Sequence, residues 1–164
     1  MMVASDETHN ILAPEKASLF ACLSQLGELH GLLGWCKEEI PEEFEVGGRN
    51  VRSALRDAQD KLFIIQGEIA GADKSVLLSE VETLGSFVKK VAHSRPQLQA
   101  LLTPGQTELS ARLNVTRAVA RRIEQRVAEL QENGRMLSTS SRTYLNRLSS
   151  LLDALARTFN IPDV

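Results

Sequence analysis

The sequence predicts an all-α fold, an antiparallel bundle of four to five helices. Three observations favour it. Aromatic residues make up 4% of the chain, whereas strands are enriched in aromatic and β-branched residues. Apolar residues recur at steps of three and four along most of the sequence, which is the spacing of one helix face. No segment shows the strict apolar–polar alternation of a half-buried strand.

The first predicted helix covers residues 14–37. Pro14 suits an early helical position, because its fixed φ matches the helix and its missing N–H would have no partner there. Pro41 marks the end of the helix. The members of its apolar side are Leu19, Leu23, Leu26, Leu29 or His30, and Leu33.

The second predicted helix covers residues 50–70, and its apolar seam alternates steps of four and three. The seam consists of Val51, Leu55, Ala58, Leu62, Ile65 and Ile69. Such a seam is typical of helices that pack lengthwise against their neighbours. The preceding Gly47-Gly48 lacks the Gly-Lys-Ser/Thr of a phosphate-binding loop and therefore predicts the turn that enters this helix.

A third, shorter helix is predicted to open at Ser79. Glu82 follows three residues later, the spacing of a capping box in which each side chain bonds a backbone N–H of the first turn. The buried face of this helix would consist of Val81, Leu84, Phe87 or Val88, and Val91.

Two further helices complete the predicted bundle. The fourth begins after Pro104-Gly105 and continues to Asn133-Gly134, where a glycine in the left-handed conformation can end a helix. Its seam consists of Leu109, Leu113, Thr116, Ala120, Ile123, Val127 and Leu130. The fifth begins among the serines of residues 138–141, which are good N-caps. It buries Tyr144, Leu148, Leu151, Leu152 and Leu155.

Size and charge restrict the class of protein. The 164 residues are enough for one core, and we expect a single domain over residues 1–164 in which residues 1–13 are flexible. The net charge of −2 provides no field that would attract nucleic acid or an anionic membrane. No apolar run approaches the roughly 20 residues of a membrane span. We therefore expect neither nucleic acid nor membrane as a partner.

The amino-terminal sequence and the cysteines predict a cytoplasmic protein. The first ten residues, MMVASDETHN, have no cationic start followed by an apolar core, as a secretory signal would. Cys22 and Cys36 are then expected to be free thiols in a reducing compartment. Neither belongs to a C-x-x-C pair and the three histidines are scattered, so no metal site is predicted.

Polar residues of the last two predicted helices are candidates for a binding site. Residues 112–126 hold five arginines against one acid, Glu124. At about 100° per residue, Arg117, Arg121 and Glu124 share one side of the apolar seam, and Arg122 and Arg126 the other. Composition favours a solvated face, with a phosphate site as the alternative because guanidinium forks fit phosphate oxygens.

On the fifth predicted helix a polar stripe faces away from the leucines. It consists of Asn146, Ser150, Asp153 and Arg157. By itself such a stripe is typical of the wet side of an amphipathic helix.

Sequence motifs on these helices resemble a known family. Residues 117–124, RAVARRIE, resemble the RTVCRRAE signature of the ATP:cob(I)alamin (corrinoid) adenosyltransferases of the propanediol-utilisation type. Residues 144–149, YLNRLS, and 155–157, LAR, resemble the family's YLNRLSD and LAR. More loosely, residues 101–105 resemble its FILPGG, and residues 55–70 its LRxIQNDLFxLGAELA helix.

The resemblance implies a homotrimer of five-helix bundles with active sites between subunits. It implies transfer of the 5′-deoxyadenosyl group of ATP to cob(I)alamin, with ATP, Mg²⁺ and cobalamin as ligands. By resemblance, Arg121, Glu124 and Asn146 bind ATP, with Glu124 ordering the site. Arg117 would form an ion pair between subunits, and Arg122 belongs with it as an intersubunit or site-supporting residue.

The sequence also departs from the family pattern. No glycine precedes Gly27, so the family's TGDxGxTxL phosphate-binding loop is not found. Ser24 and Gln25 stand where the family has the two acids of VDEL, which leaves Arg117 without its expected partner. Ser150 replaces the Asp of YLNRLSD. These departures predict weak ATP binding and keep a second hypothesis open, a catalytically lapsed member that acts as a trimeric binding or structural protein.

Overall fold

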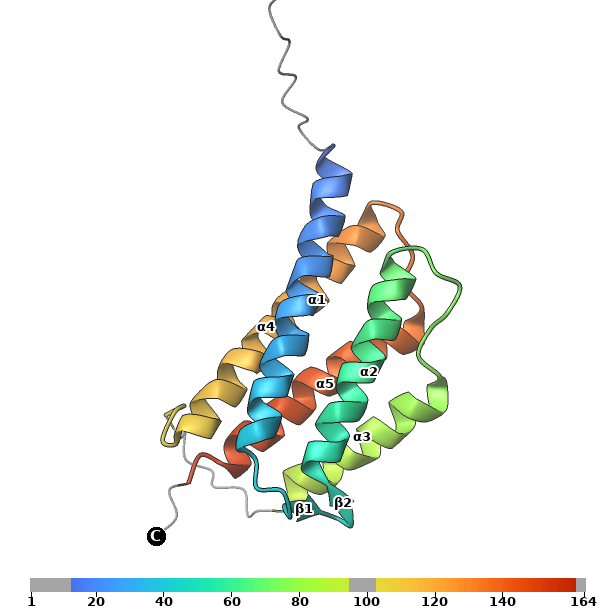
Figure 1. Cartoon of the computed structure of the whole chain (residues 1–164). Coiled ribbons are helices and arrows are strands. Elements are labelled where there is room, and N and C mark those ends of the chain that lie inside the picture. The colour runs from blue at the N-terminus through green and yellow to red at the C-terminus, as the bar shows by residue number, and fades with distance from the viewer. Residues whose placement is uncertain (1–12, 95–102, 162–164) are drawn as a thin grey trace, which may run out of the picture.

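The computed structural model describes residues 13–94 and 103–161, in which five helices and one small hairpin are found (Figure 1). The helices are α1 (Pro14–Glu39), α2 (Val51–Ile69), α3 (Leu78–His93), α4 (Glu108–Glu132) and α5 (Thr139–Thr158). The hairpin strands are β1 (Glu45–Val46) and β2 (Arg49–Asn50). The predicted all-α bundle is confirmed. The expected flexibility of residues 1–13 and the missing phosphate loop concern residues that lie almost entirely outside the described ranges.

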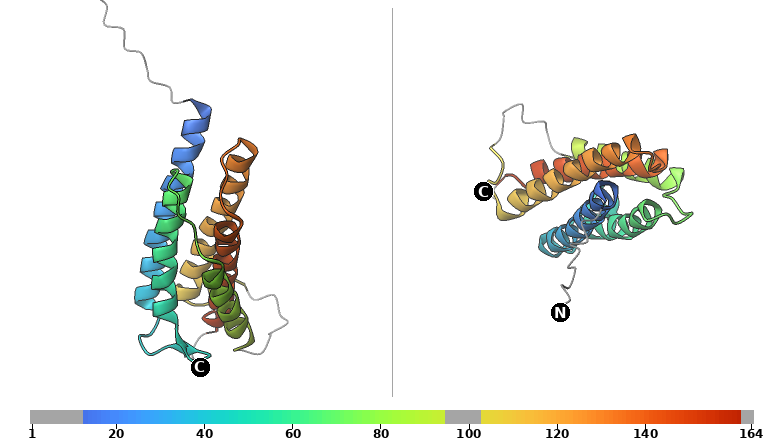
Figure 2. Two further views of the ribbon diagram at one scale, coloured as in Figure 1. Left: turned by 90° about the vertical axis from the view of Figure 1, so that its right-hand side faces the viewer. Right: turned by 90° about the horizontal axis from the view of Figure 1, so that it is seen from above.

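The helices form two layers. α1 and α2 lie side by side in one layer, and α3, α4 and α5 lie in the other (Figure 2). α5 packs against both α3 and α4, and α4 in turn packs against α1. Among the described helices none is long and apolar enough to cross a membrane.

The predicted seams form the core. Every predicted seam position of α2 and α5 is buried, as are those of α4 except Leu109, which is half-buried. On α1, Leu19 and Leu23 are only half-buried, while Cys22 and Cys36 are fully buried beside Leu26, Leu29 and Leu33. The cysteines therefore behave as small apolar residues of the core.

The hairpin corrects the expectation that the chain has no strands. Glu45 pairs with Asn50 and Val46 with Arg49, which is too short a pattern for alternation to reveal. The turn is formed by Gly47 and Gly48 at φ +57° and +77°, and two consecutive positive φ values suit glycine in a tight hairpin. The predicted turn before α2 is therefore confirmed.

The predicted capping box of α3 is wrong. The helix begins at Leu78, and the Glu80 carboxylate, not that of Glu82, accepts the Leu77 backbone N–H at 2.9 Å. A tertiary contact with α5 explains the earlier start of α3. Val76 is buried and its N–H donates to Ser141 Oγ of α5 at 3.3 Å, which fixes where the chain enters α3.

A carboxylate from α2 holds the start of α5. Glu68 accepts the Ser138 backbone N–H at 2.6 Å and also accepts the Ser141 hydroxyl. Ser138 is the N-cap, as the serine cluster predicted, and its hydroxyl accepts the Ser141 N–H at 3.2 Å. A negative charge at a helix amino terminus also interacts favourably with the helix dipole.

We expect Glu68→Ala to lower the free energy of unfolding by about 2 to 3 kcal/mol, because two bonds to a charged acceptor are lost. Glu82→Ala, at an exposed position of α3, is the matched control and should change it by less than about 0.5 kcal/mol. Urea denaturation followed by circular dichroism measures both. Equal effects of the two substitutions would show that Glu68 does not hold α5.

Candidate functional site

α4 and α5 bring four polar side chains together at the surface of the bundle. The Glu124 carboxylate lies at their centre and accepts hydrogen bonds from Asn146 Nδ2 at 3.0 Å and Ser149 Oγ at 2.6 Å. Arg121 Nη1 lies 3.5 Å from the same carboxylate. We call Arg121, Glu124, Asn146 and Ser149 the Glu124 cluster.

The helices position this cluster through their buried seams. Arg121 and Glu124 follow the buried Ala120 and Ile123 on α4, and Asn146 and Ser149 lie one turn apart on α5. Because the buried neighbours prevent either helix from rotating, the polar side chains meet along the boundary between α4 and α5.

A second carboxylate lies two turns away on the same boundary. Asp153 on α5 lies 3.6 Å from Arg117 Nε on α4 and accepts a hydrogen bond from Arg157 Nε at 3.0 Å. We call these three residues the Asp153 bridge. The sequence indicated that Arg117 lacks its expected acid, and the structure places a carboxylate of the same chain beside it.

The structure joins the three residues that the resemblance placed at ATP. Arg121, Glu124 and Asn146 form one cluster, although they come from two motifs. Arg122 lies on the other flank of α4, with Nη2 3.8 Å from Glu28 of α1. It is therefore outside the cluster. Ser149 was not predicted, although its spacing of three from Asn146 on a helix places it on the same side.

The exposed guanidinium groups of this surface can bind an anion. Arg121 is 54% exposed, whereas Glu124 is 20% exposed and satisfied by its neighbours. Three arginines, Arg117, Arg121 and Arg157, face two carboxylates, Glu124 and Asp153. One positive charge is left in excess, on guanidinium groups whose outer N–H donors face solvent.

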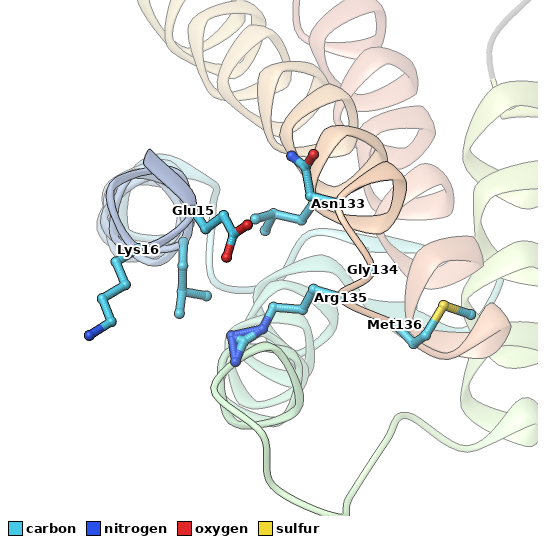
Figure 3. A pocket seen from close by; sticks show the side chains of 8 residues that line it. Glu15, Lys16, Asn133, Gly134, Arg135 and Met136 are labelled. Carbon is cyan, nitrogen blue, oxygen red and sulfur yellow. The ribbon is translucent and has the colours of Figure 1, made fainter. Parts of the chain in front are cut away.

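Two hollows of the described residues differ in size and in their distance from the cluster. One of about 140 Å³ adjoins the cluster and is lined by Glu124, Val127, Ala128, Gln131, Arg142 and Leu145. Small-molecule sites usually have about 300 to 1,000 Å³. A larger hollow of about 490 Å³ separates the start of α1, at Glu15 and Lys16, from residues 133–136 after α4 (Figure 3). No residue of the Glu124 cluster lines it.

The described side chains do not fit a magnesium ion held by the protein. In residues 13–94 and 103–161 no group of three or more His, Cys, Asp or Glu side chains could hold a metal. Both oxygens of Glu124 accept hydrogen bonds, and both oxygens of Asp153 lie beside arginines. Magnesium commonly takes few protein ligands and several phosphate and water oxygens, so an ion expected from the resemblance would have to be held by the substrate's phosphates.

The chain is similar in sequence to proteins of the family that its motifs resemble. The profile of the family described as Cobalamin adenosyltransferase matches residues 8–159. A Cobalamin adenosyltransferase from Cupriavidus metallidurans is 31% identical over 141 residues, which cover 84% of this chain and 72% of that protein. The Corrinoid adenosyltransferase PduO of Salmonella typhimurium is 30% identical over 139 residues. That match covers 80% of this chain but 39% of the relative.

A solved structure shows the same fold. It is a variant PduO-type ATP:corrinoid adenosyltransferase from Lactobacillus reuteri, complexed with cobalamin and ATP, with a TM-score of 0.75 and 21% identity. The superposition covers 89% of this chain and 80% of that chain. The predicted family resemblance and bundle architecture are confirmed.

The two thiols are free, as predicted, but unsuited to nucleophilic chemistry. Burial raises the pKa of Cys22 to about 11, although the charge of Arg126 lowers it somewhat. Burial likewise raises the pKa of Cys36, whose sulfur lies 3.3 Å from Thr116 Oγ1. The thiolate is the reactive form, so neither cysteine is an active-site candidate.

We expect both cysteines of the folded protein to resist Ellman's reagent at pH 8, because burial blocks access and disfavours the thiolate. Two equivalents should react once the protein is unfolded in guanidinium chloride. Absorbance of the released thiolate measures both. Rapid reaction of one native thiol would show that the core around it opens.

Proposed function

The chain belongs to the cobalamin adenosyltransferase family, and from this premise we propose that it transfers the 5′-deoxyadenosyl group of ATP to cob(I)alamin. The cobalt attacks the ribose C5′ of ATP, and triphosphate leaves. The observation that carries the proposal is the meeting of Arg121, Glu124 and Asn146 in one surface cluster. The comparisons lend no support to the alternative of a catalytically lapsed member.

Arg121 is suited to the leaving group. Triphosphate carries several negative charges, and preorganised guanidinium donors stabilise such charge as it develops. Glu124 lies on one side of Arg121 and leaves half of the guanidinium side chain exposed. Arg121 is thereby oriented by the protein while it keeps donors for phosphate oxygens.

Glu124 also determines which atom of Asn146 faces a ligand. An ionised carboxylate only accepts hydrogen bonds, so the Asn146 amide nitrogen points at Glu124. The amide oxygen then points away from Glu124. It can accept a hydrogen bond from a ribose hydroxyl or from the adenine amino group.

The site is incomplete within one chain, and we infer that neighbouring subunits complete it in a homotrimer. The hollow beside Glu124 has about 140 Å³, too little for a nucleotide and a corrinoid together. A surface contributed by a second copy would enclose the exposed cluster. Two free cysteines agree with a reducing cytoplasm, where we place the protein.

We expect Arg121→Ala to weaken binding of magnesium-ATP about 10- to 100-fold, since a hydrogen bond to a charged group contributes about 1.5 to 3 kcal/mol. Arg126→Ala is the matched control, because Arg126 forms the same kind of i,i+3 pair with Glu129 on α4, away from the cluster. Its dissociation constant should stay within twofold of the wild type. Calorimetry measures binding, and the spectrum of adenosylcobalamin measures turnover. A wild-type chain that makes no adenosylcobalamin would contradict the proposal and favour the alternative of a catalytically lapsed member.

We expect light scattering at micromolar concentration to report three times the 18.1 kDa of one chain. The exposed cluster needs a second surface, and a closed ring of identical contacts supplies it to every subunit. A strict monomer with full activity would contradict the shared site.

A further inference from the structure

We propose that Asp153 is a positioning residue that holds Arg117 within its own subunit, in line with the Glu124 cluster. The inference rests on the proposed function, because it adds Arg117 to Arg121 as a second guanidinium for the leaving triphosphate. We call these two arginines the cationic edge. The inference also adds a residue, Asp153, that the motifs did not indicate as part of the site.

The geometry places Asp153 between two arginines from different helices. Its Oδ1 lies 3.6 Å from Arg117 Nε and its Oδ2 lies 3.0 Å from Arg157 Nε. Arg117 Nε is buried and has no hydrogen-bond partner among residues 13–94 and 103–161. Its N–H therefore depends on the Asp153 carboxylate for compensation, since a buried unpaired charged donor is costly.

The Asp153 bridge and the Glu124 cluster are separated by the same number of residues on α4 and on α5. Arg117 and Glu124 are seven residues apart on α4, and Asn146 and Asp153 are seven residues apart on α5. Seven residues are about two turns, so the two carboxylates lie along one line at the boundary between the helices. Arg117 is one turn from Arg121 on the same side of α4. A guanidinium fixed at this place extends the cationic edge that begins at Arg121.

Positions where the family pattern has acids are neutral in this chain. Ser24 and Gln25 carry no charge where an acid of a neighbouring subunit was implied, and Ser150 carries none one turn before Asp153. The Ser150 hydroxyl donates to the backbone carbonyl of Asn146 at 3.0 Å. Asp153, one turn after Ser150 on α5, is the carboxylate that the structure places beside Arg117 of the same chain.

Removing the Asp153 carboxylate has two opposite effects on the reaction of ATP, one on its binding and one on the rate at which triphosphate leaves. Removing the Asp153 charge makes the surface more positive and by itself would tighten ATP binding. Losing the alignment of Arg117 would slow the step in which triphosphate leaves, because small misplacements of a positioned group are costly. We therefore expect Asp153→Asn to lower kcat about tenfold or more while KM for ATP stays equal or falls.

Steady-state kinetics of a double-mutant cycle test this: the cycle consists of four proteins, the wild type, Asp153→Asn, Arg117→Gln and the double variant, and two further variants accompany it. Arg117→Gln should lower kcat similarly, and the double variant should be no slower than the slower single variant. Asp153→Glu should restore part of kcat. Glu129→Gln, which removes the acid of the Arg126 pair, is the control and should stay within twofold of the wild type. Multiplying effects of Asp153→Asn and Arg117→Gln, or an unchanged kcat in Asp153→Asn, would overturn the proposal.

Two readouts separate this inference from the proposed reaction. Unfolding in urea of the same four proteins should show coupling between Arg117 and Asp153 even if the wild type made no adenosylcobalamin. Light scattering should give Arg117→Gln the mass of the wild type, because the pair lies within one chain. Additive effects on unfolding, or dissociation of Arg117→Gln into smaller species, would show that the partner of Arg117 is not Asp153.

Discussion

Burial of α5 between α3 and α4 constrains the rest of the molecule. Leu148, Leu151 and Leu155 are fully buried, so α5 cannot rotate without exposing them, and each fully buried leucine contributes on the order of 2 kcal/mol. Its polar stripe is therefore confined to one boundary, along α4. The Glu124 cluster and the Asp153 bridge both lie there because the core leaves no other place for them.

The polar contacts act on top of this packing. Charge-assisted hydrogen bonds at a partly exposed boundary contribute less than the apolar seams beneath them, so the core determines the register. The carboxylates determine the orientation of the hydrogen-bond donors around them. Glu124 turns the Asn146 amide, and Asp153 lies beside the buried Nε of Arg117. A rigid pair of helices thus presents oriented cationic groups at the surface where we propose that the anionic leaving group binds.

Connections distant in sequence keep α5 in place. Glu68, at the end of α2, binds the first turn of α5, and the same turn accepts the Val76 N–H that precedes α3. Three helices are thereby joined at one point. The site depends on this junction indirectly, because the position of α5 along its axis decides which α5 residues lie opposite Arg117 and Glu124.

The sequence by itself determined the helical class, most of the buried seam positions, the start of α5 among the serines of residues 138–141, the left-handed Gly134 that follows α4, and the shared side of Arg117, Arg121 and Glu124. All of these follow from periodicity and local backbone preferences, which act within a few residues. Its motifs also indicated the family and the residues Arg121, Glu124 and Asn146. Tertiary structure alone decided the start of α3, the part of Ser149, and the pairing of Arg117 with Asp153. Each of these depends on which residues of one segment meet those of another far along the chain, and that is set by how buried side chains of several helices fit together rather than by any local pattern.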